Sequence, residues 1–499
     1  MKGPPGRLPV EPQARSLFSP VLHLLGQTML AVAALMILPL AVDLWAGSPD
    51  WHAFGIGIAL SVVIGLAMTR STAPVDDSGL TVRQAFLLTP LSWVVVALVG
   101  ALPLYLTDFG NTGGSVTNAF FESMSGLTTT GSTVVTGLDN APPGFLLWRS
   151  ILQWAGGIGI IAVAIAVLPN LNIGGMQLFR TESSDRSDKV MPRARQMVAA
   201  LALTYLGFTV LCAIAYWACG MTVFEAVNHA LTTLSTGGFS TSDSSFGNWD
   251  ENGIQYVATL FMLAGGIPFV LYVRALAGER RALWDTQVRA YLGFLAFTIT
   301  VAVLYLWLRD QFDFATALRY AAFNTVSVVT TTGYATTDYS LWGGAAAGAV
   351  FGLTFVGGCT GSTAGGIKIF RFQVLFRLFR THFRSLLYPR GVFPNTYGDR
   401  PLTNDVIGSV IVFFAIFFAC YSLVTIALMA MDLDFLTSAS AAVTALANVG
   451  PGLGDQIGPA GNFADMPGAA KWLLCLAMLM GRLELFTVLV LFMPRFWRG

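Results

Sequence analysis

One short glycine-centred segment occurs four times in this chain, and the repetition restricts the folds that the chain can adopt. Its glycines, which we align as Gly131, Gly237, Gly333 and Gly450, lie roughly 100 residues apart. Such a spacing indicates that a whole structural unit is repeated. The four copies are Thr128–Ser132, Leu234–Gly238, Thr330–Tyr334 and the weaker Ala447–Pro451.

The residues around each glycine define the unit. A mildly polar segment of about a dozen residues precedes each glycine, which suits a re-entrant helix because it is too short to span a bilayer. Long apolar runs stand before and after it, so the unit is predicted as helix, re-entrant helix, loop, helix. The four short segments are Asn118–Thr128, Phe224–Leu234, Phe314–Val329 and Phe435–Ala447.

The second long helix of each unit also carries a repeated pattern of small residues. Small residues let membrane helices approach closely, or let a helix bend. The pattern recurs at a similar distance after each loop glycine and weakens in the fourth copy. The four sites are Ala155–Gly157, Ala264–Gly266, Val356–Gly358 and Met480–Arg482.

Four non-helical loops at membrane depth predict one shared cavity, since irregular backbone there must be surrounded by protein or water. Glycine permits unusual φ and ψ, so backbone carbonyls can turn inward and replace the hydration shell of an ion. The C-terminal dipole ends of the re-entrant helices also favour a cation. The predicted filter residues are Thr129, Thr130, Gly131, Ser235, Thr236, Gly237, Thr331, Thr332, Gly333, Asn448, Val449 and Gly450.

Polar residues occur nine positions before three of these glycines, at Glu122, Asn228 and Asn324, where the fourth copy has Ala441. They either form a polar girdle that braces the filter or make ordinary hydrogen bonds within the re-entrant helices.

Arg482 lies in an apolar run, where a charge costs about 2.5–3.5 kcal/mol. It either faces the pore below the filter or pairs with a carboxylate elsewhere.

Composition supports an all-α membrane protein. Hydrophobic residues make up 55% of the chain and charged residues only 11%, unlike ordinary soluble proteins. The net charge of +1 gives no support for nucleic-acid binding. The five cysteines and four histidines show no disulfide or metal-ligand spacing. We expect no cofactor, and no enzymatic constellation of residues occurs at membrane depth.

Two further apolar runs, Val21–Trp45 and Phe54–Met68, precede the repeats, with Asp43 and Asp50 expected in the turn between them. Together with the eight long helices of the repeats they predict ten spanning helices. We divide the chain into an N-terminal segment with the extra helices, then repeats one to four. The boundaries are 1–79, 80–195, 196–286, 287–400 and 401–499.

Basic residues follow every second spanning helix, on the same side as the N-terminus. By the positive-inside rule both termini are predicted to be cytoplasmic. Arg309 and Arg319 are exceptions. Aspartates on the opposite side either concentrate cations at an outer mouth or are ordinary loop residues. The basic residues are Arg180, Arg186, Lys189, Arg193, Arg195, Arg280, Arg281, Arg289, Arg380, Arg384, Arg390, Arg400, Arg495 and Arg498.

The four-fold pattern, over residues 80 to 495, resembles the TrkH/KtrB/HKT superfamily of potassium transporters, and the extra helices are most like TrkH. The resemblance implies four potassium-channel-like repeats around one pore, and glycine at all four filter positions matches potassium-selective members. It also implies a homodimer bound to a cytoplasmic nucleotide-binding ring (TrkA-like). The segment from Gly357 to Lys368 matches the intramembrane loop of this superfamily, which implies a movable gate, although a static kink is the alternative. The implied gate residues are Gly357, Gly358, Cys359, Thr360, Gly361, Ser362, Thr363, Ala364, Gly365, Gly366, Lys368 and Arg482.

The function predicted on these grounds is passive potassium uptake across the bacterial inner membrane. The alternative is a potassium transporter coupled to sodium or proton entry, which needs intramembrane carboxylates; Glu122 and Glu484 are candidates. A solute transporter with broken helices should show two inverted repeats, whereas this chain has four copies in one orientation. A phosphate-binding loop at Gly361–Lys368 is excluded because Ile367 stands where lysine is required.

Overall fold

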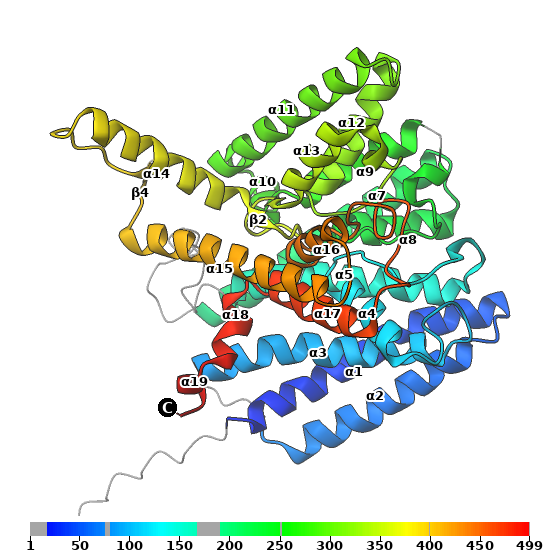
Figure 1. Ribbon diagram of the computed structural model, residues 1–499. Helices are drawn as coiled ribbons and strands as arrows, with labels where there is room; N and C mark the ends of the chain where they lie inside the picture. The colour runs from blue at the N-terminus through cyan, green and yellow to red at the C-terminus, as the bar shows by residue number, and fades with distance from the viewer. Residues whose placement is uncertain (1–16, 75–79, 167–189, 250–251, 399, 499) are drawn as a thin grey trace, which may run out of the picture.

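The chain folds into a helical bundle with two extra N-terminal helices and four repeats (Figure 1). The structure, a computed structural model, describes residues 17–74, 80–166, 190–249, 252–398 and 400–498. Within these ranges seven helices are long and apolar enough to cross a membrane, or nine if each of two bent helix pairs is one span. The tenth predicted span is interrupted by the loop that follows α13.

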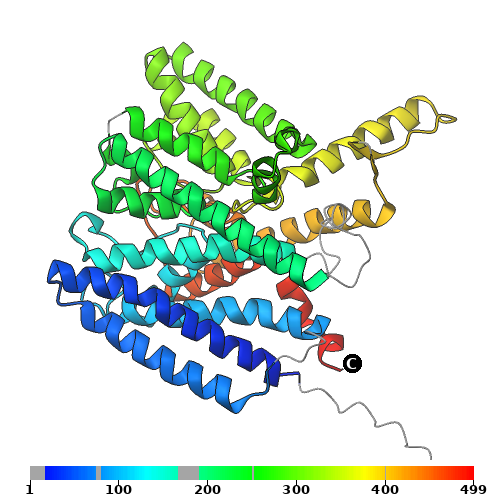
Figure 2. The same cartoon turned by 180° about the vertical axis from the view of Figure 1, so that it is seen from behind.

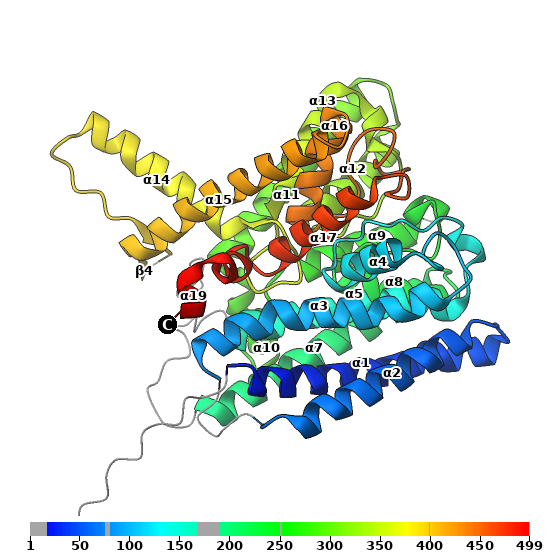
Figure 3. The same ribbon diagram turned by 60° about the horizontal axis from the view of Figure 1, so that its bottom comes forward.

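Helices α1 (Ser19–Ala46) and α2 (Trp51–Ser71) form an antiparallel hairpin that packs beside α3, as Figure 3 shows. Close approach is possible because Gly26 and Gly65 face each other: a Cβ on Gly26 would lie 2.8 Å from the carbonyl oxygen of Gly65. Asp43 was expected in the turn but lies inside α1. Its buried carboxylate accepts a hydrogen bond from the amide of Gly144 at 2.7 Å, which ties the extra helices to repeat one.

The four repeats follow in chain order. Repeat one comprises α3 (Val82–Leu106), α4 (Val116–Leu127) and α5 (Pro143–Ala166). Repeat two comprises α7 (Val190–Ala218), α8 (Val223–Leu234), α9 (Asn252–Gly265) and α10 (Phe269–Leu276). Repeat three comprises α11 (Thr286–Leu308), α12 (Phe314–Val329), α13 (Gly344–Thr354) and α14 (Ile369–Leu387). Repeat four comprises α15 (Asn404–Met429), α16 (Phe435–Ala447), α17 (Gly468–Arg482) and α18 (Phe486–Leu489), and α19 (Pro494–Arg498) ends the described chain.

Each short helix begins at a residue suited to cap it. Ser115, Thr222, Asp313 and Asp434 occupy the four N-cap positions, and their side chains accept hydrogen bonds from backbone amides of the first turn. Thr222 and Glu225 form a complete capping box. The observed short helices therefore begin within two residues of the predicted ones.

The second long helix is bent in two repeats, where single long helices were predicted. In repeat two, α9 and α10 meet at 91°, and in repeat four α17 and α18 meet at 112°. Pro268 interrupts the helical hydrogen bonds in the first case. In the second, Glu484 and Leu485 adopt positive φ angles of 64° and 41°. Both bends redirect the chain below the filter loops.

The re-entrant helices form the core of the molecule. Every residue of α16 from Thr437 to Ala447 is buried. The predicted close approach at small residues is present: a Cβ on Gly156 would overlap the carbonyl oxygen of Leu127, and one on Gly481 would overlap that of Leu446. These leucines stand at the ends of α4 and α16, so the second long helices support the re-entrant helices where the filter loops begin.

Short irregular elements occur near the ends of the bundle and within it. After three filter loops the chain forms short 3₁₀ helices at Leu138–Asn140, Ser245–Asn248 and Tyr339–Trp342. Strands β1 (Val356–Gly357) and β2 (Ile367–Lys368) pair in parallel, and β3 (Thr396–Tyr397) and β4 (Arg400–Pro401) pair antiparallel. Helix α14 projects away from the bundle with the start of α15, on the side where α1 begins and α19 lies (Figures 1 and 2).

Candidate ion pathway

The four filter loops share one backbone conformation. In each, a residue in the left-handed region is followed two positions later by a glycine of positive φ. The left-handed residues are Thr129, Thr236, Thr331 and Asn448, with φ between 51° and 57°. The glycines are Gly131, Gly238, Gly333 and Gly450, with φ between 82° and 110°. Threonine in this region is uncommon and strained, and such strain persists where the surrounding structure enforces it.

This conformation corrects the predicted register of repeat two. The glycine equivalent to Gly131 is Gly238, and Gly237 corresponds to Thr130. Backbone hydrogen bonds agree, because Thr130 and Gly237 each donate to a carbonyl five residues earlier in the chain, that of Ser125 or Thr232. The adjacent glycines allowed two alignments of the sequence. The aromatic residue after Gly238 matches Tyr334 after Gly333 and indicates the correct one.

The four glycines pack against carbonyl groups in a closed circle. A Cβ on Gly131 would overlap the carbonyl oxygen of Gly237, and one on Gly238 would overlap that of Thr332. Gly333 stands in the same relation to Val449, and a Cβ on Gly450 would lie 2.7 Å from the oxygen of Thr130. Each repeat therefore contacts the next, from one to four and back to one. The circle brings together four carbonyls, those of Thr130, Gly237, Thr332 and Val449.

Hydroxyl groups hold the loops to their helices. Thr128 and Thr330 donate through Oγ1 to the carbonyls of Met124 and Val326, both at 2.7 Å. Ser235 occupies the equivalent position in repeat two and donates to Leu231 at 2.8 Å. It thus lies one residue before its predicted place. In the fourth repeat Asn448 Nδ2 donates to Thr130 Oγ1 at 3.0 Å and to the carbonyl of Met478 at 2.9 Å, so an amide takes the place of the hydroxyls.

The corrected register also changes the predicted girdle. In repeat two the position nine residues before the glycine is His229, not Asn228. Its Nε2 lies 3.0 Å from Ser240 Oγ, beyond the filter glycine. Asn324 accepts from the amide of Thr336 at 3.3 Å and donates to its Oγ1 at 2.7 Å. These bonds join the re-entrant helices to the segments that follow the filter glycines, as a bracing girdle requires.

The intramembrane loop of repeat three lies against the inner ends of the filter loops. Thr363 Oγ1 is 3.0 Å from the carbonyl oxygens of both Leu234 and Gly265. The amide of Gly365 donates to Thr331 Oγ1 at 2.6 Å, which links the loop directly to a filter residue. The loop starts in β1 and ends in β2, and positive φ occurs at Gly361 and Gly366.

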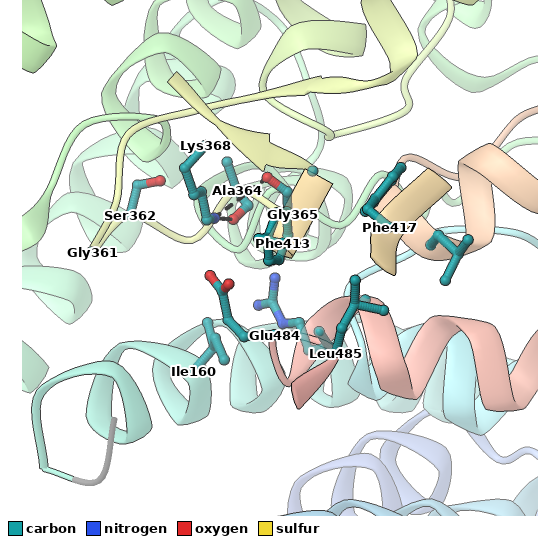
Figure 4. A pocket seen from close by; sticks show the side chains of 14 residues that line it. Ile160, Gly361, Ser362, Ala364, Gly365, Lys368, Phe413, Phe417, Glu484 and Leu485 are labelled. Carbon is teal, nitrogen blue, oxygen red and sulfur yellow. Dashed lines mark hydrogen bonds between the residues drawn. The ribbon is translucent and has the colours of Figure 1, made fainter. Parts of the chain in front are cut away.

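Other predicted gate residues fix the loop to repeat two and to α11. The amide of Cys359 donates to the carbonyl of Gly266 at 2.9 Å, and the amide of Thr360 donates to Gln287 Oε1 at 2.6 Å. Ser362 Oγ donates to the carbonyl of Cys359 at 2.6 Å. The ammonium of Lys368 donates to the carbonyl of Ala364, as the dashed line in Figure 4 marks.

Arg482 lies at the end of α17, directly below the loop. Its Nη1 donates to the carbonyl of Thr363 at 2.8 Å, its Nη2 donates to the carbonyl of Gly156 at 3.2 Å, and its side chain is buried. Among the described residues no carboxylate bonds to it. The nearby Glu484 pairs instead with Arg371 of α14. Arg482 therefore anchors the loop through carbonyls, while Glu484, its neighbour in the chain, pairs elsewhere.

A small cavity lies between the loop and the end of α17. Gly365, Lys368, Arg482 and Glu484 are among its lining residues, and Phe413 and Phe417 of α15 close one side (Figure 4). Its volume is about 30 Å³, whereas one water needs about 10–15 Å³. The loop and Arg482 therefore line a small space beneath the filter loops.

Several acidic residues in the loops opposite the basic ones have structural roles. Asp243 accepts from the amides of Gly137 and Leu138 at 2.7 and 3.1 Å, which joins repeats one and two. Asp338 and Asp434 cap helices. Asp250, Glu251 and the basic residues Arg180, Arg186 and Lys189 lie outside the described residues.

Comparisons with known proteins match this architecture. The family model TrkH, described as a cation transport protein, matches residues 53–498. The Trk system potassium uptake protein TrkI of Halomonas elongata is 49% identical over 484 residues, covering 96% of this chain and 97% of the relative. TrkH of Escherichia coli is 36% identical over 486 residues, covering 96% and 99%.

A solved structure agrees with these matches. The crystal structure of the potassium transporter TrkH from Vibrio parahaemolyticus has a TM-score of 0.89 and 34% identity, covering 96% of this chain and all of that chain. The identity and the coverage extend over all four repeats and the extra helices. This chain belongs to the TrkH family of cation transport proteins.

Proposed function

We propose that this chain takes up potassium ions across the bacterial cytoplasmic membrane through the circle of carbonyls formed by its four filter loops. The observation that carries the proposal is the cyclic contact of the four glycines with the carbonyls of Thr130, Gly237, Thr332 and Val449. Carbonyl oxygens arranged around an axis replace the hydration shell of a cation. Relatives that share most of this chain are named potassium uptake proteins.

Inward movement of the ion is passive in this proposal. One elementary charge that crosses 100 mV gains about 2.3 kcal/mol, so the membrane potential alone drives uptake. Coupling to sodium or protons would need a second site with intramembrane carboxylates. The two candidates, Glu122 and Glu484, are already paired with arginines, which favours passive conduction over the coupled alternative.

The intramembrane loop with Arg482 is the proposed gate. Its hydrogen bonds to Leu234, Gly265 and Thr331 hold it beneath the filter, and Arg482 bonds to it at the carbonyl of Thr363. Opening would break these bonds and move the loop aside. We therefore assign the described conformation to the closed state.

The orientation and the assembly are also proposals. Basic residues on the side of α14 and α19, among them Arg380, Arg384 and Arg495, favour a cytoplasmic location for that side. The projecting helix α14 offers a surface there for a nucleotide-binding regulatory ring of the TrkA type. A homodimer is proposed on the resemblance to the superfamily alone.

Uptake of ⁸⁶Rb⁺ into proteoliposomes tests the function, with potassium trapped inside, sodium outside, and no imposed sodium or proton gradient. The wild type should accumulate ⁸⁶Rb⁺ with weak competition from sodium. Gly131→Ser should lose uptake or become permeable to sodium, because its Cβ would overlap the carbonyl oxygen of Gly237. Uptake that appears only with an imposed gradient would support the coupled transporter. No uptake, alone or with a nucleotide-binding Trk partner added, would contradict the proposal.

A further inference from the structure

A buried ion pair lies behind the first filter loop. Glu122 of α4 and Arg149 of α5 meet with Nε and Oε1 2.8 Å apart, and their side chains are 0% and 1% exposed. Charges are rare at this depth because removing them from water is costly, and a pair persists only with good geometry and further hydrogen bonds. The partners of this pair show what it holds in place.

The carboxylate of Glu122 holds the chain just beyond the first filter glycine. It accepts from Thr133 Oγ1 at 2.9 and 3.1 Å and from the amide of Val134 at 2.9 Å. Hydrogen bonds to a charged group are stronger than those between neutral groups. Glu122 therefore fixes the position of the segment that follows Gly131.

Arg149 extends this contact to the second filter loop. Its Nη1 donates to the carbonyl of Ser240 at 3.2 Å, and its guanidinium carbon lies 4.1 Å from the centre of the Phe239 ring. Phe239 and Ser240 directly follow Gly238 in the chain. Nη2 also donates to Thr133 Oγ1 at 3.3 Å. One guanidinium therefore bridges the segments that follow Gly131 and Gly238.

In the third and fourth repeats, neutral groups hold the corresponding segments to the re-entrant helix of the same repeat, and other neutral contacts, such as Tyr334 Oη with Thr233 Oγ1 at 3.2 Å, cross to a neighbouring repeat. Asn324 bonds to Thr336 in repeat three. In repeat four the amide of Leu453 donates to Ser440 Oγ at 3.0 Å. A neutral side chain thus suffices to hold the segment after a filter glycine to the re-entrant helix of its own repeat. The charged pair in repeat one also reaches across to repeat two through Arg149, beside the neutral Gln153, whose Nε2 donates to the carbonyl of Gly237 at 2.6 Å.

We propose that Glu122 and Arg149 are positioning residues that fix the distance between filter loops one and two and thereby help the filter to prefer potassium over sodium. The inference rests on the proposed function. A filter loop free to move inward would let its carbonyls approach the smaller sodium ion. The buried pair resists that movement without touching the ion.

Ion binding to the purified protein tests the inference without requiring an open gate. Isothermal titration calorimetry with KCl and with NaCl in detergent gives the ratio of the potassium and sodium affinities. The test variant is the double substitution Glu122→Asn/Arg149→Met, which removes both charges. It gives repeat one the amide side chain that repeat three has at the equivalent position, Asn324. The control is Arg274→Met/Glu279→Gln, which removes an ion pair that is 36% and 61% exposed.

The double variant should lose the potassium preference by about tenfold, the effect of one lost hydrogen bond to a charged group, while the control keeps the wild-type ratio. A second variant, Arg149→Lys, keeps the charge but lacks the planar group that bonds to several partners. Its ratio of potassium to sodium affinity should lie between those of the wild type and the double variant. If the double variant does not fold, Arg149→Lys alone tests the inference.

Three results would overturn the inference. A double variant with a lower melting temperature and an unchanged affinity ratio would show that the pair serves stability alone. Arg149→Lys with the full wild-type ratio would show that the bridge to Ser240 is not needed. A wild-type protein without preference for potassium would overturn the proposed function and this inference together. The first two results leave the proposed function intact.

Discussion

Replacing Arg482 by glutamine should open the pathway, because this residue holds the intramembrane loop. The guanidinium donates to the loop at the carbonyl of Thr363, 2.8 Å away, and to α5 at the carbonyl of Gly156. Glutamine is shorter and neutral, so the substitution breaks both bonds. It also removes a positive charge from the space through which a cation would leave the filter.

The magnitude follows from the lost bond to the loop. A hydrogen bond to a charged group contributes about 1.5–3 kcal/mol, and each 1.4 kcal/mol corresponds to about a tenfold change in an equilibrium constant. The ratio of closed to open protein should therefore fall by about 10- to 150-fold in Arg482→Gln. Uptake in the absence of any partner should rise until the open fraction approaches one.

Uptake of ⁸⁶Rb⁺ into proteoliposomes measures this effect at equal protein content. Arg482→Lys is the matched control, because it keeps the charge but cannot bond to both carbonyls in the same geometry. It should show uptake between that of the wild type and that of Arg482→Gln. Equal uptake by the wild type and a well-folded Arg482→Gln would refute the assignment of Arg482 as an anchor of the closed loop.

Three further outcomes follow from the structure. Gly238→Ala should abolish selective ⁸⁶Rb⁺ uptake, whereas Gly237→Ala should reduce it less, since φ is positive only at Gly238; the reverse order would contradict the corrected register. Thr331→Val should raise uptake without a partner, because the amide of Gly365 loses its acceptor; unchanged uptake would show that this bond does not hold the loop. Asp434→Ala should lower the free energy of unfolding by about 1 kcal/mol, a usual cost for a lost N-cap, measured by denaturant titration. Hydrogen bonding to Thr437 lowers the pKa of Asp434, so its stabilisation is complete above the ordinary carboxyl pKa and is lost as the pH falls through the lowered value.

The sequence predicted the four short helices well because both of their ends carry local signals. An N-cap residue such as Asp434 marks each start, and the glycine loop marks each end.

The bends in the second long helices were missed in repeats two and four. Hydropathy continues across Pro268 and across Glu484, so a search for apolar runs joins the two halves. At Glu484 only the backbone angles reveal the turn, whereas Pro268 is itself a local signal of a break in the helix.

The alignment of the filter glycine in repeat two was wrong for a different reason. Gly237 and Gly238 both satisfy a pattern that asks only for glycine, and the choice depends on which of them adopts positive φ. The same shift concealed His229 as a member of the girdle.

The pairing of Glu122 with Arg149 was not predicted, because it joins residues from two helices 27 positions apart. A lone arginine in an apolar helix is nevertheless a signal to look for such a partner.

The location of bound ions is the sharpest test of a carbonyl filter. Crystals grown in rubidium chloride, measured at the rubidium absorption edge, would show each bound ion by its anomalous scattering. The account predicts a peak on the axis among the carbonyl oxygens of Thr130, Gly237, Thr332 and Val449. Rubidium peaks confined to other places, such as the loops that carry Asp243 and Asp338, would contradict a filter built from these four loops.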